Sequence, residues 1–424
     1  MSKWIAGIIL VLSSVLYQSG RAETVTIEQV LNSAFAVHPA VTVARAGYQQ
    51  ALGQRLTDLS PDPASFSLEY GGMQSGETIG AHEERKLSIS QEFEFPLNYA
   101  WRVKATNIGI KEARINAFIQ MLDLELEVRN AYIQAWVIDQ QLKILKENAD
   151  AASKYADQLK RLVELGESAP LEEKRARVES LQTITKLEAV RKERKAIWRK
   201  LQSLTGIDTA GIVLNPPLAI NSPNPFPMKG EYKLDSSLEL RSSKLHSTLA
   251  DVETKAAMFS WLPDLELSYF QQNIPLPDDS DFWGVEFGIS LPIWFWLSGR
   301  GEIQTAKANR RAAHSNMEIA RLQKQTEAIS LTQTQQALWE KLTLYNEQVN
   351  PLAIEVYELA MRSYNVGEAT YLEVIDSQRT MLDIQLEHLE IKATLAVVTS
   401  ELDRITGKSV IGIDKFQNIL NKGH

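Results

Sequence analysis

Two long stretches of the chain carry apolar residues at alternating steps of three and four positions. A period of 3.5 residues that continues this far predicts long helices that supercoil around their neighbours. An amphipathic helix over a globular core would be shorter and would show a period nearer 3.6. The first apolar seam consists of Leu124, Val128, Ala131, Ala135, Ile138, Leu142, Leu145, Ala149, Ala152, Ala156, Leu159 and Val163, and the second of Ala328, Leu331, Leu338, Leu342, Tyr345, Val349, Leu352, Val356 and Leu359.

Glycines and prolines divide these stretches into two long helices, each followed by a returning helix. The predicted ranges are 99–165 and 170–205 in the first half, and 298–366 and 370–405 in the second. The first long helix would measure roughly 100 Å at 1.5 Å per residue. Gly166 and Gly367 stand where a helix ends most easily in the left-handed conformation. Asn350-Pro351 should kink or break the second long helix, because proline removes a hydrogen-bond donor.

A pair of short segments precedes each long helix and alternates apolar with polar side chains. These strand pairs are predicted within 64–96 and 263–293, and a period of two indicates a sheet with one apolar and one polar face. Strands of about ten residues are long enough to cross a bilayer when tilted. The aromatic residues near their ends suit a membrane girdle: Trp261, Trp283, Trp294 and Trp296. A soluble antiparallel sheet is the alternative. If the sheet spans a membrane, several chains must share it, because four strands cannot close a barrel.

The two halves of the chain match each other at a spacing of about 200 positions, which indicates an internal repeat. For example, Leu165-Gly166-Glu167 corresponds to Val366-Gly367-Glu368. We therefore expect a first repeat over 23–232 and a second over 233–424, each with a helix, a strand pair, a long helix and a returning helix. The first repeat would close with an equatorial segment and the second with a C-terminal segment.

The N-terminus has the pattern of a secretory signal peptide over residues 1–22. Lys3 precedes an apolar run, and Gly20-Arg21-Ala22 places small residues at the cleavage positions. A membrane anchor is the alternative, but the run is shorter than the roughly 20 residues that a spanning helix needs. The 424 residues have a formal net charge of −8 and no cysteine. This composition gives no support to nucleic-acid binding and excludes disulfides and thiol chemistry.

The stretch "YNVGEATYLEVIDSQRTML" is the most specific piece of the sequence. An aromatic residue, Val-Gly, and two acids separated by two apolar residues resemble the TolC-type outer-membrane efflux protein family. The resemblance covers nearly all of the mature chain. "LSISQEFEFP" and "HPAV" are more similar to the heavy-metal (cobalt–zinc–cadmium type) branch, which serves resistance–nodulation–division pumps. That branch usually continues with Gly-Lys-Arg, whereas residues 96–102 here read "PLNYAWR".

The resemblance implies a homotrimer, mainly α with β. Three chains would form a twelve-stranded outer-membrane β-barrel, continued by a long α-helical coiled-coil tunnel in the periplasm. A periplasmic adaptor (membrane fusion protein) and an inner-membrane pump would be its partners, with no cofactor. The helical hairpin tips that meet the adaptor would include Leu165, Gly166, Tyr364, Val366 and Gly367. The segments at 206–232 and around Pro351 would form an equatorial belt.

Glu373 and Asp376 match the two acidic positions that line the closed periplasmic end of the tunnel in this family. Three copies would bring six carboxylates together at this gate, so their mutual repulsion should raise some of their pKa values. An acidic ring would also favour cations. The alternative is that both acids lie on a solvated outer helix face.

These features predict the outer-membrane channel of a tripartite efflux system, a passive exit duct for metal cations or other small toxic solutes. A soluble periplasmic coiled-coil scaffold or adaptor is one alternative, and an exit duct for drugs or a secreted polypeptide is another. An enzyme is not expected, because the sequence lacks phosphate-binding and dinucleotide-binding loops, HExxH and GxSxG. The histidines do not pair at helical metal-ligand spacing, so no resident metal is expected either.

Overall fold

The computed structural model describes residues 23–71, 84–208, 211–217, 236–274, 280–290 and 295–421, and these are largely helical with a few strands. The predicted signal peptide, Trp294 and part of the expected equatorial belt (209–210 and 218–232) lie outside the described residues, as does the side chain of Trp296. The chain divides into two compact units. Unit 1 comprises residues up to 41, 121–232 and 327–415, and unit 2 comprises 42–120, 233–326 and 416–424.

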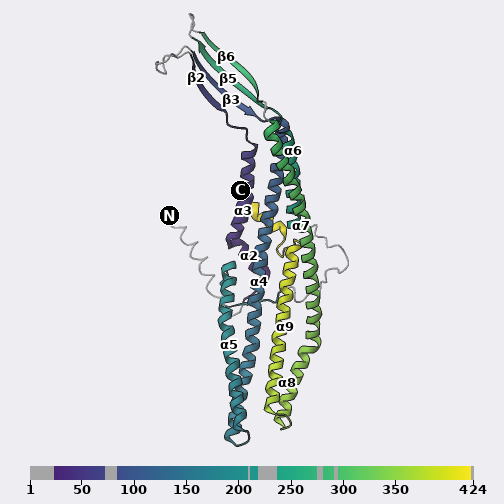
Figure 1. Cartoon of the computed structure of the whole chain (residues 1–424). Coiled ribbons are helices and arrows are strands. Elements are labelled where there is room, and N and C mark those ends of the chain that lie inside the picture. The colour runs from purple at the N-terminus through teal and green to yellow at the C-terminus, as the bar shows by residue number, and fades with distance from the viewer. Residues whose placement is uncertain are drawn as a thin grey trace, which may run out of the picture. The chain divides into compact units, whose positions relative to one another are not determined.

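Unit 1 is a bundle of helices (Figure 1), and it also contains a small two-stranded parallel sheet. Its helices are α2 (Ile27–Val37), the second part of α4 (Pro96–Glu164), α5 (Pro170–Thr205), the end of α7 (Phe295–Leu344), α8 (Asn350–Asn365) and α9 (Tyr371–Ile405). The small sheet pairs β1 (Glu23–Val25) with β4 (Ile212–Leu214). The buried hydroxyl of Tyr132 on α4 donates to the carbonyls of Val25 and Asn215, at 3.0 and 2.8 Å, and so fixes this sheet to the bundle.

Unit 2 contains a four-stranded antiparallel sheet in the order β2-β3-β5-β6. The strands are β2 (Ser65–Gly71), β3 (Glu84–Phe93), β5 (Asp264–Ile274) and β6 (Ser280–Ser290). Most of α3 (Pro39–Leu59), all of α6 (Leu238–Phe259) and the first parts of α4 and α7 also belong to this unit, as does most of α10 (Ile413–Asn421).

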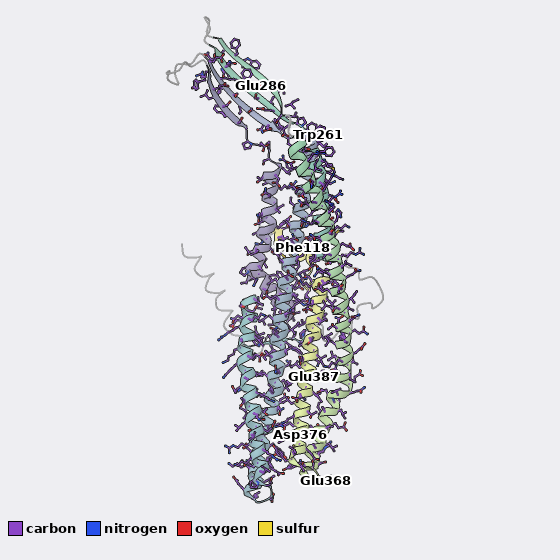
Figure 2. All side chains as sticks on the ribbon, in the orientation of Figure 1. Phe118, Trp261, Glu286, Glu368, Asp376 and Glu387 are labelled. Atoms are coloured by element: carbon purple, nitrogen blue, oxygen red, sulfur yellow. The ribbon has the colours of Figure 1, made fainter. Side chains whose placement is uncertain are left out.

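The sheet of unit 2 has one apolar and one polar face, as its alternating sequence predicts. One cross-strand row consists of Phe66, Ile89, Tyr269 and Val285. The neighbouring row on the other face consists of Ser65, Ser90, Ser268 and Glu286 (Figure 2). All four members of the apolar row are exposed, although an antiparallel sheet in water normally buries its apolar face against a core.

The first apolar seam forms the core side of α4. Nine of its predicted members are buried: Leu124, Val128, Ala131, Ala135, Ile138, Leu145, Ala149, Ala152 and Leu159. The 69-residue helix is continuous from Pro96 to Glu164, and α5 returns over Pro170–Thr205. The small alanine side chains along this seam allow neighbouring helices to approach closely.

The second apolar seam departs from the prediction. Ala328 and Leu342 are buried, but Leu352, Val356 and Leu359 are exposed. A π-helical turn at Tyr345–Val349 separates α7 from α8 just before Pro351. Such a turn holds one residue more than an α-helical turn, so every later residue is rotated around the helix axis. Ala353 is consequently buried in place of Leu352.

Candidate functional site

Two helical turns in unit 1 have closely similar backbone geometry. α4 turns into α5 at Gly166 and α8 turns into α9 at Gly367, with φ values of 78° and 82°. In each turn a glutamate amide donates to a carbonyl five residues earlier: Glu167 to Leu162 at 2.8 Å and Glu368 to Ser363 at 2.9 Å. This bond defines a Schellman-type helix end, whose left-handed residue is strained for any side chain with a Cβ.

The predicted tip residues separate into exposed and inward-facing groups. Leu165 and Val366 are each 71% exposed, so the turns present apolar side chains to solvent. Tyr364 instead packs against a buried cluster formed by Leu159, Ala176, Tyr371 and Ile375. We therefore describe Tyr364 as part of the packing between the hairpins rather than as an exposed tip residue.

Three tyrosines connect the two helical hairpins next to this cluster. The Tyr155 ring on α4 stacks on Tyr371 of α9 at 5.3 Å between centroids, and its edge meets Tyr364 at 5.8 Å. Burial is the main cause that raises the pKa of the Tyr155 and Tyr371 hydroxyls well above the usual value. Both phenols therefore remain neutral. The sequence analysis did not identify this cluster, because aromatic residues on separate helices show no shared spacing.

Glu373 is exposed at the start of α9, and it completes the cap of that helix. Its carboxylate accepts hydrogen bonds from the Thr370 backbone N–H at 2.6 Å and from the Thr370 hydroxyl at 3.0 Å. The Thr370 hydroxyl in turn accepts a bond from the Glu373 N–H at 3.4 Å. This is a capping box, and its T-x-x-E signature was visible in the sequence. These hydrogen bonds lower the pKa of Glu373 within the single chain.

Asp376 lies one turn further along α9 and is exposed near the lower end of the bundle (Figure 2). Arg379 is one more turn along, and its guanidinium pairs with Glu179 of α5. The hydrogen bond with Glu179 is the main cause that raises the pKa of Arg379, and the charge of Asp376 raises it further. An arginine therefore accompanies the two predicted gate acids and ties α9 to α5, which the sequence analysis did not identify.

The two described tryptophans of the predicted girdle lie near opposite ends of the sheet in unit 2. Trp261 precedes β5 and is 51% exposed, while Trp283 on β6 is 73% exposed and pairs with Gln271. From Asp264 to Gln271, β5 rises about 24 Å at 3.4 Å per residue. The apolar band of membrane barrels is about 25 Å tall and carries aromatic girdles on both sides. Because barrel strands are tilted by roughly 35–45°, this length would span only about 17–20 Å of the height of that band, and the girdle role of the two tryptophans stays a prediction.

Within the described part of the chain, no set of three or more histidine or acidic side chains comes together as a metal ion would require. A separate search of the same residues finds no helix with the length and apolarity needed to cross a membrane.

Comparisons with known proteins agree with this architecture. Residues 233–408 match the family described as "Outer membrane efflux protein". The chain is 18% identical over 362 residues to the cobalt-zinc-cadmium resistance protein CzcC of Cupriavidus metallidurans, an alignment that covers 84% of this chain and 78% of CzcC.

Two solved structures share the fold. The CmeC outer membrane channel of Campylobacter jejuni has a TM-score of 0.75 at 16% identity, with 93% of this chain and 89% of CmeC covered. The outer membrane protein VceC of Vibrio cholerae has a TM-score of 0.74 at 17% identity, with 90% and 96% covered. At these identities the solved structures show a shared fold, and residues 233–408 resemble the outer membrane efflux protein family.

Proposed function

We propose that this protein is the outer-membrane channel of an efflux system, a passive duct that leads solutes across the outer membrane and the periplasm. The observation that carries the proposal is the uncovered apolar face of the sheet. In water such a face would be costly, because roughly 25 cal/mol is lost for each Å² of apolar surface left exposed. In a bilayer the same face is matched to its surroundings.

The sheet further supports a trimeric barrel. Its outer strands, β2 and β6, each have one unpaired edge within the sheet. Unpaired backbone groups are not tolerated in lipid, so the edges of several chains must join. Three copies give a closed barrel of twelve strands, and the internal repeat supplies each chain with two similar strand pairs. The long helices then continue as a periplasmic tunnel.

The helical turns are the proposed contact with a periplasmic adaptor, and an inner-membrane pump would complete the assembly. Leu165 and Val366 supply exposed apolar side chains for that contact, and Gly166 and Gly367 supply the tight backbone. Glu373 and Asp376 form the acidic ring at the closed end of the tunnel. Metal cations are the proposed cargo, in keeping with the name of the relative CzcC. No catalytic step is part of this proposal.

A matched pair of substitutions in β6 tests the membrane assignment. Phe287 lies on the apolar face and is 81% exposed, while its neighbour Glu286 lies on the polar face. Phe287→Arg places a charge in lipid, which costs about 2–4 kcal/mol near the middle of the bilayer. Glu286→Arg adds the same side chain on the side of the lumen.

We expect the wild-type chain to fractionate with the outer membrane as a heat-sensitive trimer that needs detergent. Phe287→Arg should strongly reduce this trimer, whereas Glu286→Arg should leave its amount nearly unchanged. A chain that is monomeric and dispersed without detergent would contradict the proposal. Such a result would favour the alternative of a soluble periplasmic scaffold or adaptor.

A further inference from the structure

An open cavity of about 370 Å³ lies in unit 2, where the sheet continues into the long helix α4. Its walls come from the end of α3 and the linker that follows, the end of β3, the start of β5 and the first turns of α4. The wall on α4 belongs to the stretch "PLNYAWR", in which the sequence departs from the heavy-metal branch. Ligand sites commonly measure roughly 300–1,000 Å³, so the cavity has room for a small polar headgroup.

Hydrogen bonds within the single chain hold the walls of this cavity in place. The side-chain amide of Gln91 donates to the carbonyl of Asp62 at 2.6 Å, which keeps the linker beside β3. The Tyr99 hydroxyl donates to the carbonyl of Leu59 at 3.4 Å, which joins α4 to the end of α3. Because the walls are already fixed, a ligand that enters the cavity has little of the protein to order.

The cavity is lined by charges of both signs. Arg102 Nη2 pairs with Glu94 Oε2 at 3.0 Å, and the guanidinium lies 5.4 Å from the centre of the Tyr99 ring. The buried Nε of Arg102 has no hydrogen-bond partner among the described residues. Asp62 and Glu92 are exposed, and neither forms an ion pair with the rest of the described chain. One cation with an unused donor and two unpaired acids therefore line the same space.

This combination of charges fits a zwitterion better than a simple ion. A phosphate accepts charge-assisted hydrogen bonds from a guanidinium, and an ammonium group donates such bonds to carboxylates. An anion alone would be repelled by Asp62 and Glu92. A simple cation would leave the buried Nε of Arg102 without an acceptor, which is costly.

Apolar side chains lead from the cavity to the apolar face of the sheet. Phe93 and Leu265 line the cavity and form a cross-strand pair on that face, where they are 45% and 37% exposed. Trp261 lies at the same end of the sheet (Figure 2). In the proposed channel this face contacts lipid and the long helices continue into the periplasm. The cavity therefore lies at the periplasmic border of the bilayer, at the level of the headgroups.

We propose that this cavity binds the headgroup of a zwitterionic phospholipid with a primary ammonium group, such as phosphatidylethanolamine. Arg102 binds the phosphate, and Asp62 and Glu92 bind the ammonium group. The acyl chains lie along Phe93 and Leu265 on the apolar face. The inference rests on the membrane placement of the proposed function and adds a specific lipid site to each copy of the chain.

Lipid binding to the purified protein in a neutral detergent tests this site. Native mass spectrometry counts the bound dioctanoyl phosphatidylethanolamine, and a titration gives its affinity. Two further probes each lack one recognised group: dioctanoyl phosphatidylglycerol has no ammonium group, and octylamine has no phosphate. Each should bind about tenfold more weakly, the effect expected from the loss of one hydrogen bond to a charged group. Equal binding of either probe would overturn the proposal.

Substitutions in the cavity give a second readout. Asp62→Asn with Glu92→Gln removes both unpaired acids, so it should weaken phosphatidylethanolamine binding about tenfold and leave phosphatidylglycerol binding no weaker. Glu94→Gln with Arg102→Gln removes the ion pair without leaving a lone charge, and it should abolish the preference for phosphatidylethanolamine over octylamine. Lys111→Gln, at an exposed position further along α4, is the matched control and should bind like wild type. The same affinities in all variants would contradict the assigned contacts.

Free phosphoethanolamine distinguishes a lipid from a soluble ligand. It has the same headgroup but no acyl chains, so it should not displace the lipid at equal concentration. Displacement would overturn the lipid as the source of the headgroup. Unselective lipid binding by a protein that still fractionates as an outer-membrane trimer would overturn this site and leave the proposed function intact. A monomer that needs no detergent would overturn both proposals.

Discussion

Glu373 combines two properties that substitutions at the start of α9 can separate. Its exposed carboxylate carries the charge assigned to the acidic ring, and it also closes the capping box with Thr370 at 2.6 and 3.0 Å. Glu373→Gln removes the charge but keeps an acceptor, because glutamine also completes this box. Thr370→Ala weakens the cap and keeps the charge, and Glu373→Ala removes both.

Loss of the cap should appear as a change in Tm, whereas loss of the charge should appear as a change in ion selectivity. Loss of an N-cap threonine costs about 1 kcal/mol. In a chain of this size, that loss should lower the Tm by about 2 °C. Thr370→Ala and Glu373→Ala should both lower the Tm, and Glu373→Gln, which keeps a neutral acceptor, should lower it less than Glu373→Ala. Ion selectivity should follow the charge instead. In planar bilayers under a salt gradient, the reversal potential should show weaker cation preference for both Glu373 variants and wild-type preference for Thr370→Ala.

The stabilisation that the capping box gives to the protein should decrease in acid. The hydrogen bonds from Thr370 lower the pKa of Glu373 below its ordinary value of 4.5. The cap therefore stabilises the protein fully above that ordinary value, and this stabilisation is lost as the pH falls through the lowered pKa of the folded chain. In an assembled ring, repulsion between copies would act in the opposite direction, so selectivity measured down to about pH 4 reports which effect is larger.

Unchanged ion selectivity in variants without these charges would refute the acidic ring of Glu373 and Asp376. If Glu373→Gln, Asp376→Asn and their combination all keep the wild-type reversal potential and block by multivalent cations, the charges do not face the ion path. Glu373 would then act only in the cap, and both acids would belong to a solvated helix face.

Further predictions concern the turn and a buried acid. Gly367→Val forces a β-branched residue to φ 82° and should impair cross-linking to the adaptor and efflux, while the outer-membrane trimer persists; Gly367→Asn, which tolerates this conformation, should behave like wild type. Glu125 is 2% exposed and accepts bonds from Ser409 and Val410 at 2.6 and 2.8 Å, and burial raises its pKa. Stability from this group is complete below the unfolded pKa and is lost as the pH rises through the folded pKa. In Glu125→Gln the Tm should therefore decrease less steeply with pH above about pH 4.5 than in the wild type. The same decrease in both proteins would contradict a raised pKa of Glu125.

Local patterns made much of the fold predictable. The Gly166 and Gly367 turns, the four alternating strands and the core side of α4 each depend on nearby residues whose spacing is visible in the sequence. Contacts between hairpins depend on pairs such as Arg379 and Glu179, whose distance along the chain has no period. For that reason, the ion pair and the tyrosine cluster could be found only in three dimensions. The capping box was visible in the sequence, but the acidic pair was interpreted only as a charged face.

The second seam shows why a correct period can still place residues on the wrong side of a helix. The apolar steps remain regular from Leu342 to Leu359, so the sequence alone assigns them to one face. Pro351 cannot donate a backbone hydrogen bond, and the preceding helix accommodates it with a π-helical turn. The extra residue rotates Leu352 and Val356 out of the core of their own chain. Deletion of one residue from this turn should rotate them back into that core. A cysteine at position 356 (Val356→Cys) should then react more slowly with a water-soluble thiol reagent, although each helix would keep its sequence pattern.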